Sequence, residues 1–308
     1  MEQFNFDLII VGSGPAGMTA GIYAKRSGLK TLIIEKNIIG GQASLTYEIK
    51  NYPGFETISG MELGMLMQQQ AESLGCEFAY EVVNEINLQD KTIKTDSAIY
   101  KGKAIILALG AAARRVGVDN EENLIGKGVA YCAMCDGAFF KGEDVALIGG
   151  GNTAIEDAIY LSNICKSVTI VNNLPEFTCQ QTLKDELNKV ISEKNNITIH
   201  QNSVVNRIDG EDRLSGVEIL NTATNEKTLL NVNGMFVAIG RKPDTDIIQN
   251  QIELDKFGYI IADEDMKTSV EGIFAAGDVR VKNLRQIITA CSDGAIAATE
   301  ANSYISKL

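Results

Sequence analysis

Short continuous runs of apolar residues alternate along the chain with segments of helical spacing, which is the pattern of an α/β protein. Residues 7–12 read Asp-Leu-Ile-Ile-Val-Gly and predict a parallel strand that is buried on both faces. Comparable runs predict four further strands, at residues 30–35, 144–148, 167–171 and 233–240. Apolar residues at helical spacing between 61 and 74 predict a helix that packs on the core.

The first strand runs into a glycine-rich turn, Gly12-Ser13-Gly14-Pro15-Ala16-Gly17. Gly12 allows a sharp turn, Gly14 lets the backbone approach a pyrophosphate, and Gly17 lets the following helix pack closely on the strand. The helix N-terminus would supply N–H donors to the phosphates. Glu35 ends the next strand and is placed to accept hydrogen bonds from the ribose hydroxyls of an adenosine. This order predicts a dinucleotide site, and a glycine turn without a ligand is the alternative.

The same unit recurs later in the chain. A strand at 144–148 leads into Gly149-x-Gly151-x-x-Ala154, a helix at 155–163 and a strand at 167–171. We therefore expect an α/β protein with two Rossmann-like dinucleotide-binding domains. A third segment, residues 272–278, ends in Gly277-Asp278 and would place the Asp278 carboxylate at the carboxyl end of a sheet, although an ordinary strand end would look the same.

Cys132-Ala133-Met134-Cys135 lies between the two glycine turns and contains two thiols that can close a reversible disulfide. A structural zinc site would need two more ligands, but the chain has one histidine and no second close cysteine pair. An inert buried pair is another alternative. We favour a redox function for this cysteine pair, and we expect no metal site. Four scattered cysteines are interpreted as ordinary thiols of a reducing compartment: Cys76, Cys165, Cys179 and Cys291.

Composition narrows the class of partner. The 308 residues suit two domains, and the net charge of −12 argues against nucleic acid or an anionic membrane. The longest apolar run, 104–113, is too short to cross a membrane and is broken by Gly110. Because the N-terminus starts a strand without a basic-then-apolar signal, we expect a cytoplasmic protein.

Together these motifs resemble the low-molecular-weight thioredoxin reductase family over essentially the full length. In addition to the two glycine turns and the Cys-x-x-Cys pair followed by Asp136-Gly137, the matching segments are Gly40-Gly41-Gln42, Asn51-Tyr52-Pro53-Gly54-Phe55, Gly277-Asp278 and Arg285-Gln286. The resemblance implies that residues 1–112 and 243–308 form one FAD-binding domain. Residues 113–242 would be an inserted NAD(P)H-like domain that carries the redox pair.

The resemblance also assigns residues to the cofactor. Gly41, Gln42 and Asn51 would lie along the flavin, and Asp278 would bind the ribityl-phosphate region. Three consecutive residues would complete the FAD site: Arg285, Gln286 and Ile287.

By the same resemblance, Cys135 faces the flavin and Cys132 attacks the disulfide of a thioredoxin-like partner. Asp136 would be the proton donor or acceptor, which is chemically reasonable if partial burial raises its pKa toward neutral. The alternative for Asp136 is a simple turn residue, because Asp-Gly is a common turn pair. Family members are usually homodimers.

One segment departs from the family pattern. Where NADPH-dependent members carry His-Arg-Arg-x-x-x-Arg, residues 172–178 read Asn-Asn-Leu-Pro-Glu-Phe-Thr, without a cation for the 2′-phosphate. The departure resembles the ferredoxin-dependent flavin thioredoxin reductases, and ferredoxin is the donor we predict. An acidic ferredoxin would need a local basic patch, for which the candidates are Arg114, Arg115, Arg280, Lys282 and Arg285.

Two other functions are compatible with the sequence. An NADPH- or NADH-dependent thioredoxin reductase would need an atypical nucleotide site, because Asn172 also replaces the acid expected at the strand end. A non-enzymatic FAD and dithiol sensor would be reduced once and stop, whereas an enzyme would turn over.

Overall fold

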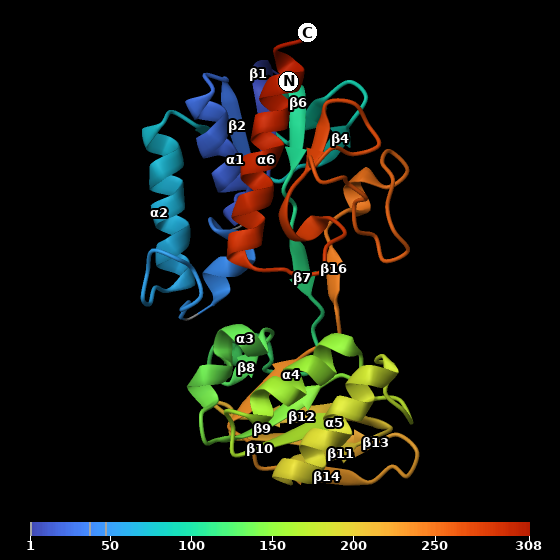
Figure 1. Ribbon diagram of the computed structural model, residues 1–308. Coiled ribbons are helices and arrows are strands. Elements are labelled where there is room, and N and C mark those ends of the chain that lie inside the picture. The colour runs from blue at the N-terminus through green and yellow to red at the C-terminus, as the bar shows by residue number, and fades with distance from the viewer. Residues whose placement is uncertain (1, 37, 47) are drawn as a thin grey trace. The chain divides into compact units, whose positions relative to one another are not determined.

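The computed structural model describes residues 2–36, 38–46 and 48–308, which fold into two compact units. Unit 1 consists of Met1–Ala112 and Lys242–Leu308, and unit 2 of Ala113–Arg241. The chain crosses between them in two strands that pair with each other, β7 (Ala111–Ala113) and β16 (Arg241–Pro243) (Figure 1).

Unit 1 is built on a seven-stranded sheet of order β3-β2-β1-β6-β5-β4, with β17 paired to β6. The strands β1, β2, β3, β6 and β17 are parallel, and the β4–β5 hairpin is antiparallel. The strand bounds are β1 (Glu2–Val11), β2 (Thr31–Glu35), β3 (Glu77–Tyr80), β4 (Glu85–Asn87), β5 (Thr92–Lys94), β6 (Ala98–Leu107) and β17 (Ile273–Ala275). The helices are α1 (Pro15–Arg26), α2 (Gly60–Ser73) and α6 (Ile287–Ile305), with short 3₁₀ turns η1 (Gly41–Leu45), η4 (Asp246–Ile248) and η5 (Gly277–Val279).

Side chains alternate between the two faces of this sheet. Leu8, Ile10 and Ile33 pack against the three helices, whereas Ile9, Val11 and their neighbours pack against β4, β5 and the segment that precedes β17. The helices α1 and α6 lie side by side over the first face (Figure 1). Because both faces are covered, the strands are continuous apolar runs.

Unit 2 has a parallel sheet of order β11-β10-β9-β15-β8 and a separate antiparallel sheet, β12-β13-β14. The strand bounds are β8 (Val129–Ala130), β9 (Asp144–Ile148), β10 (Ser167–Val171), β11 (Ile197–His200), β12 (Ser203–Asp209), β13 (Gly216–Asn221), β14 (Lys227–Leu230) and β15 (Gly234–Val237). The helices are α3 (Ala133–Asp136), α4 (Asn152–Ser162) and α5 (Gln181–Lys194), with η2 (Glu122–Leu124) and η3 (Gly137–Phe140). Helices cover one face of the parallel sheet, and the antiparallel sheet covers the other.

The predicted strands at 144–148 and 167–171 are β9 and β10. The first strand is longer than predicted, because residues 2–6 pair with β6 although most of their side chains are exposed. The strand predicted at 233–240 is shorter and ends at Val237, and the chain turns at Gly240, whose φ is +98°. The helix predicted at 155–163 begins three residues earlier, at Asn152.

Candidate functional site

The first glycine turn connects β1 to α1 and leaves the N-terminus of the helix open. Gly12 has a φ of +105°, and a Cβ atom there would lie 2.3 Å from the carbonyl oxygen of Ala108. A Cβ at Gly17 would lie 1.9 Å from the carbonyl oxygen of Gly12. Gly14, in contrast, has nothing within 4 Å of a Cβ position and caps α1 without a side-chain hydrogen bond. The turn therefore presents bare backbone at a helix N-terminus, which is a site for an anion.

Glu35 fixes this turn from the end of β2. Its Oε2 atom accepts hydrogen bonds from the Ser13 amide at 2.8 Å and from the Ser13 hydroxyl at 2.7 Å. From the sequence, Glu35 was predicted to bind a ribose. Its hydrogen bonds to Ser13, 22 positions away, were not predicted. The carboxylate thus fixes the conformation of the glycine turn.

Two later segments approach the same turn. The amide of Gly40 donates to the Ser13 carbonyl at 3.1 Å, and a Cβ at Gly41 would lie 3.3 Å from the Gly14 Cα. Gln42 follows in η1 with an exposed side chain. From the other side, a Cβ at Gly277 would lie 2.9 Å from the Cβ of Ala16, the buried second residue of α1 after Pro15. Asp278 therefore lies next to the start of α1.

The remaining predicted cofactor residues lie at the start of α6. Asn51 donates from Nδ2 to the Gln286 Oε1 at 3.0 Å. Gln286 also caps α6 through a reciprocal pair of hydrogen bonds with Thr289, and Ile287 is the first helical residue. One turn further along α6, Ala290 lies 3.7 Å from the Cβ position at Gly277. The helix thus brings these residues to the turn that carries Asp278.

Arg285 supplies a donor that fits a bound anion or flavin. Its guanidinium lies 4.3 Å from the ring centroid of Tyr259, and its Nε atom is buried without a hydrogen-bond partner among the described residues. A buried donor without a partner is costly, and an acceptor group of a ligand would remove that cost. Together with the open backbone at Gly14 and the crowded turn at Gly12, this geometry fits FAD.

The redox pair lies in unit 2. Cys132 and Cys135 are joined by a disulfide, and Cys132 caps the short helix α3, where its sulfur accepts from the Cys135 amide at 3.2 Å. The segment packs closely on α4, because a Cβ at Gly137 would lie 3.1 Å from atoms of both Tyr160 and Leu161.

Asp136 follows directly and has a partly buried side chain. Burial raises the pKa of its carboxyl from 3.8 to about 6, which is the range required of a proton donor at neutral pH. Its backbone is helical, and so is that of Gly137. The Asp-Gly pair is therefore not a left-handed turn, but type I turns have similar backbone angles, so the turn interpretation of Asp136 stays an alternative.

Sequence reasoning missed the network beside Cys132. The Tyr131 hydroxyl donates to Glu121 Oε1 at 2.6 Å, and the carboxylate also accepts from the amides of Val116 and Gly117. Glu121 is 3% exposed. No motif signals this contact, because it depends on a loop returning to the segment before the redox pair.

The second glycine turn packs against the loop at residues 172–178, which belongs to the same unit. A Cβ at Gly150 would lie 2.3 Å from Oδ1 of Asn172, whose Nδ2 donates to the carbonyls of Leu174 and Glu176 and to Gln201. The Thr178 amide donates to the Gly150 carbonyl at 2.9 Å. Asn172 is 2% exposed and holds the loop together. It is therefore not placed like a ribose-binding acid.

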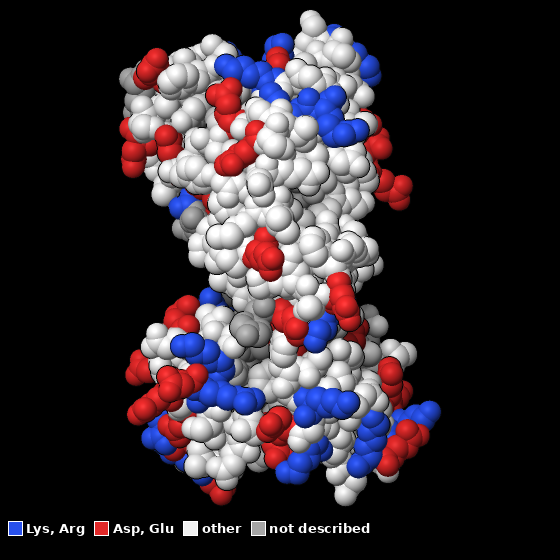
Figure 2. Space-filling model, turned by 90° about the vertical axis from the view of Figure 1, so that its left-hand side faces the viewer, with Lys and Arg blue, Asp and Glu red and all other residues white. Residues whose placement is uncertain are grey.

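The basic patch suggested by the sequence is wrong for two of its candidates. The side chains of Arg280 and Lys282 are only partly exposed, and both pair with Asp293, at 2.9 and 2.7 Å. Arg115 pairs with Glu122, at 3.1 Å, and stacks on a tyrosine ring. On the face shown in Figure 2, Lys and Arg are interspersed with Asp and Glu in each unit, so this face of the described chain has no large basic area.

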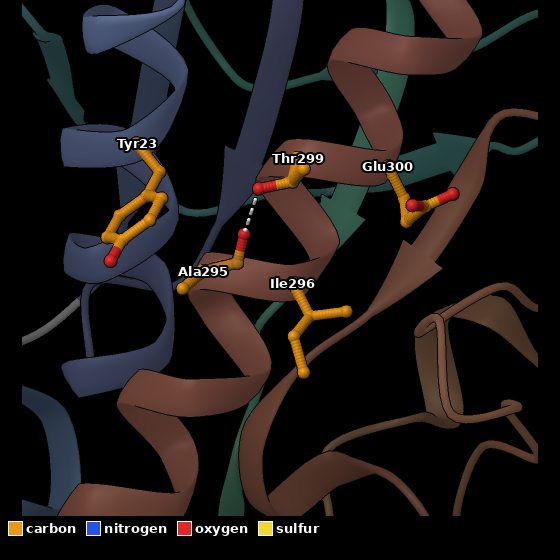
Figure 3. A pocket seen from close by; sticks show the side chains of 5 residues that line it. All are labelled: Tyr23, Ala295, Ile296, Thr299 and Glu300. Carbon is orange, nitrogen blue, oxygen red and sulfur yellow. Dashed lines mark hydrogen bonds between the residues drawn. The ribbon is translucent and has the colours of Figure 1, made fainter.

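A hollow elsewhere on unit 1 lies outside this site. It has a volume of about 290 Å³ and is lined by residues of α1 and α6, among them Tyr23, Ile296 and Glu300 (Figure 3). Thr299 donates its hydroxyl to the Ala295 carbonyl of its own helix at 2.8 Å. Because it contains no redox group, we assign it no part in the chemistry.

All four remaining cysteines are buried thiols: Cys76, Cys165, Cys179 and Cys291. Among the described residues, no helix is long and apolar enough to span a membrane.

Comparisons with known proteins agree with this geometry. The model of the pyridine nucleotide-disulphide oxidoreductase family matches residues 6–294. A thioredoxin reductase of Listeria monocytogenes is 42% identical over 100% of this chain and 96% of its own length. A protein of Clostridium pasteurianum, described as a 34.2 kDa protein in the rubredoxin operon, is 43% identical over 99% of this chain and 98% of its own.

The fold agrees as well. The crystal structure of thioredoxin reductase from Streptococcus pyogenes has a TM-score of 0.90 and 42% identity, and covers 99% of each chain. The predicted α/β class with two Rossmann-like domains is confirmed.

Proposed function

Because the chain belongs to the pyridine nucleotide-disulphide oxidoreductase family and is a thioredoxin reductase-like flavoprotein that uses FAD, we propose roles for its residues and a donor for its electrons. Unit 1 is proposed to be the FAD-binding domain, and unit 2 the domain that carries the redox pair. The acceptor is a thioredoxin-like protein disulfide. We also infer a homodimer from the family resemblance, which sedimentation of the purified protein would test.

The FAD proposal rests on one constellation of unit 1. The backbone at Gly12, Gly14 and Gly17, with Pro15 and Ala16, would hold the pyrophosphate at the α1 N-terminus. Glu35 would accept from the adenosine ribose and Asp278 from the ribityl chain. The residues proposed along the flavin are Gly41, Gln42, Asn51, Arg285, Gln286 and Ile287. FAD, when bound, supplies the electrons that reduce the disulfide.

The proposed chemistry of the chain is thiol–disulfide exchange. Once the pair is reduced, the Cys132 thiolate attacks a sulfur of the partner disulfide and releases one partner thiolate. Cys135 then attacks Cys132 Sγ of the mixed disulfide, so the second partner thiol leaves and Cys132–Cys135 reforms. Asp136, whose pKa is raised to about 6, is proposed to deliver and remove the protons. The observation that supports this role is the partly buried carboxyl of the residue that follows Cys135 of the disulfide.

Ferredoxin is the proposed donor. The 2′-phosphate of NADPH needs cations, and residues 172–178 contain none, while the exposed positions Asn173, Leu174 and Thr178 replace arginines of the family motif. Electron delivery to FAD one at a time needs no hydride donor beside the flavin.

Anaerobic titration of the purified flavoprotein tests the donor. Reduced ferredoxin, NADPH and NADH are added separately while flavin absorbance is followed, and then oxidised thioredoxin is supplied to measure turnover. We expect only ferredoxin to bleach the flavin rapidly and support turnover. Rapid reduction by micromolar NADPH would make the protein an NADPH-dependent reductase. A protein that is reduced once without turnover would be a redox sensor.

A further inference from the structure

A buried carboxylate in α6 is bound from three sides. The Oδ2 atom of Asp293 accepts from the Gly277 amide at 3.0 Å, from Arg280 Nε at 2.9 Å and from Lys282 Nζ at 2.7 Å. Its Oδ1 accepts from Arg280 Nη2 at 3.2 Å. Asp293 is 4% exposed, and none of the segments quoted above for the family resemblance includes it.

The energetics do not favour this cluster for stability alone. Burial by itself would raise the pKa of Asp293, but the hydrogen bonds from Arg280 and Lys282 outweigh it and hold the pKa below its usual range. Buried ion pairs are often no more stabilising than apolar residues of the same size. We therefore look for a segment of the chain that the cluster holds in position.

Through its hydrogen bond with the Gly277 amide, Asp293 holds the turn that precedes Asp278. Gly277 has a φ of +81° and is pressed against Ala16 of α1, where a Cβ would lie 2.9 Å from the Ala16 Cβ. On α6, a Cβ at Gly294 would lie 2.1 Å from the Ala16 carbonyl oxygen. The turn is thus held between two helices, and the Gly277–Asp293 hydrogen bond sets its place relative to both.

We propose that Asp293 is a positioning residue for FAD, which acts through the Gly277 backbone to align Asp278 with the phosphate-binding end of α1. The inference rests on the proposed FAD site. The α1 turn and Glu35 serve the ADP half of the cofactor, whereas Asp278 serves the ribityl half. Loosening the turn therefore weakens FAD binding and leaves ADP binding intact.

The test compares FAD and ADP binding to the apoprotein by isothermal titration calorimetry. Asp293→Asn keeps the size of the side chain but leaves one acceptor oxygen for three donors. We expect the FAD dissociation constant to rise about tenfold, the effect of losing one charged hydrogen bond, with ADP within about twofold of wild type. The control is Glu300→Gln, which removes the ion pair between this partly exposed residue of the same helix and Lys267 and should change neither value.

An unchanged FAD constant, or equal weakening of FAD and ADP, would overturn the proposal. If Asp293→Asn does not fold, Lys282→Met keeps the Arg280 pair and the Gly277 bond but loosens the carboxylate. FAD binding must then weaken at least about threefold with ADP unchanged, and any other result counts against the proposal. Failure of the proposed FAD site itself would show in the wild-type protein, as absent FAD binding.

Discussion

Asp136 should make the stability of the protein depend on pH. Its pKa rises from 3.8 to about 6 on folding, so between these values the folded chain binds more protons than the unfolded chain. The free energy of unfolding therefore falls as pH rises through this window, by up to about 3 kcal/mol. Asp136→Asn stays neutral and should exceed wild type by a comparable amount at pH 8 but not at pH 4.

Urea unfolding at several pH values measures this difference. Asp157 of α4 is a useful control, because burial first, and then Glu156, raises its pKa to about 7, against the opposite effect of Arg241. For Asp157→Asn the difference from wild type should therefore continue to grow up to about pH 7. A difference between Asp136→Asn and wild type that does not change with pH would contradict the burial argument.

The activity of Asp136→Asn should change as well. In steady-state turnover, this variant should lose the limb of the pH–rate profile near pH 6, while its flavin is still reduced.

The two cysteines should play unequal parts, since one sulfur faces the flavin in the proposed mechanism while the other meets the partner. Either Cys132→Ser or Cys135→Ser should abolish thioredoxin reduction. Only Cys132→Ser should keep a thiol that perturbs the flavin absorbance spectrum. Wild-type turnover in both variants would refute the assignment.

At the scale of elements, two glycines of the turn before α1 should have different roles: Gly12 is needed for the fold, and Gly14 for binding the ligand. Gly14 has an extended backbone, φ −66° and ψ 178°, and open space around a Cβ. Gly14→Ala should therefore change the free energy of unfolding by no more than about 0.5 kcal/mol. Its FAD dissociation constant should nevertheless rise at least about tenfold, because a methyl group stands where the pyrophosphate approaches the backbone.

Gly12→Ala is the matched comparison. Its left-handed φ alone costs about 1–3 kcal/mol, and the contact with Ala108 adds to this. Urea unfolding should therefore show a clear loss of stability for Gly12→Ala and almost none for Gly14→Ala, whereas calorimetric titration should show weaker FAD binding by the stable variant Gly14→Ala. If Gly14→Ala binds FAD like wild type, the pyrophosphate does not lie at this turn.

The sequence predicted best those elements that are continuous runs of buried apolar residues. The runs that became β9 and β10 are buried over most of their length, and their limits were predicted correctly. The first half of β1 escaped prediction because pairing with β6, not burial, makes it a strand. The antiparallel sheet β12–β14 was not predicted at all.

Within the site, residue types could be predicted but their partners could not. The sequence pointed to Glu35 and Asp278, yet the Ser13–Glu35 and Gly277–Asp293 hydrogen bonds join distant segments. The same limit explains the error over Arg280 and Lys282. Their charge suggested a surface patch, but both pair with the buried Asp293 of α6 and expose only a small part of their side chains.

At the scale of the whole molecule, the donor depends on both units of the proposed assignment, in which a pyridine nucleotide would have to bind unit 2 and also reach a flavin held by unit 1. The variant Asn173→Arg, Leu174→Arg, Thr178→Arg restores the cations of the family motif on a loop that Asn172 already holds in place. Each charged hydrogen bond to the 2′-phosphate is worth about 1.5–3 kcal/mol, so NADPH affinity should rise at least about tenfold.

Calorimetry with NADPH measures that gain, and NADH, which lacks the phosphate, is the control ligand. Equal gains for NADPH and NADH would show a general charge effect and contradict the phosphate argument. Flavin absorbance in the same samples then separates affinity from geometry. If NADPH binds the variant and bleaches the flavin, the missing cations were the only obstacle. If NADPH binds without bleaching, the arrangement of the two units, and not the loop, excludes the nucleotide as donor.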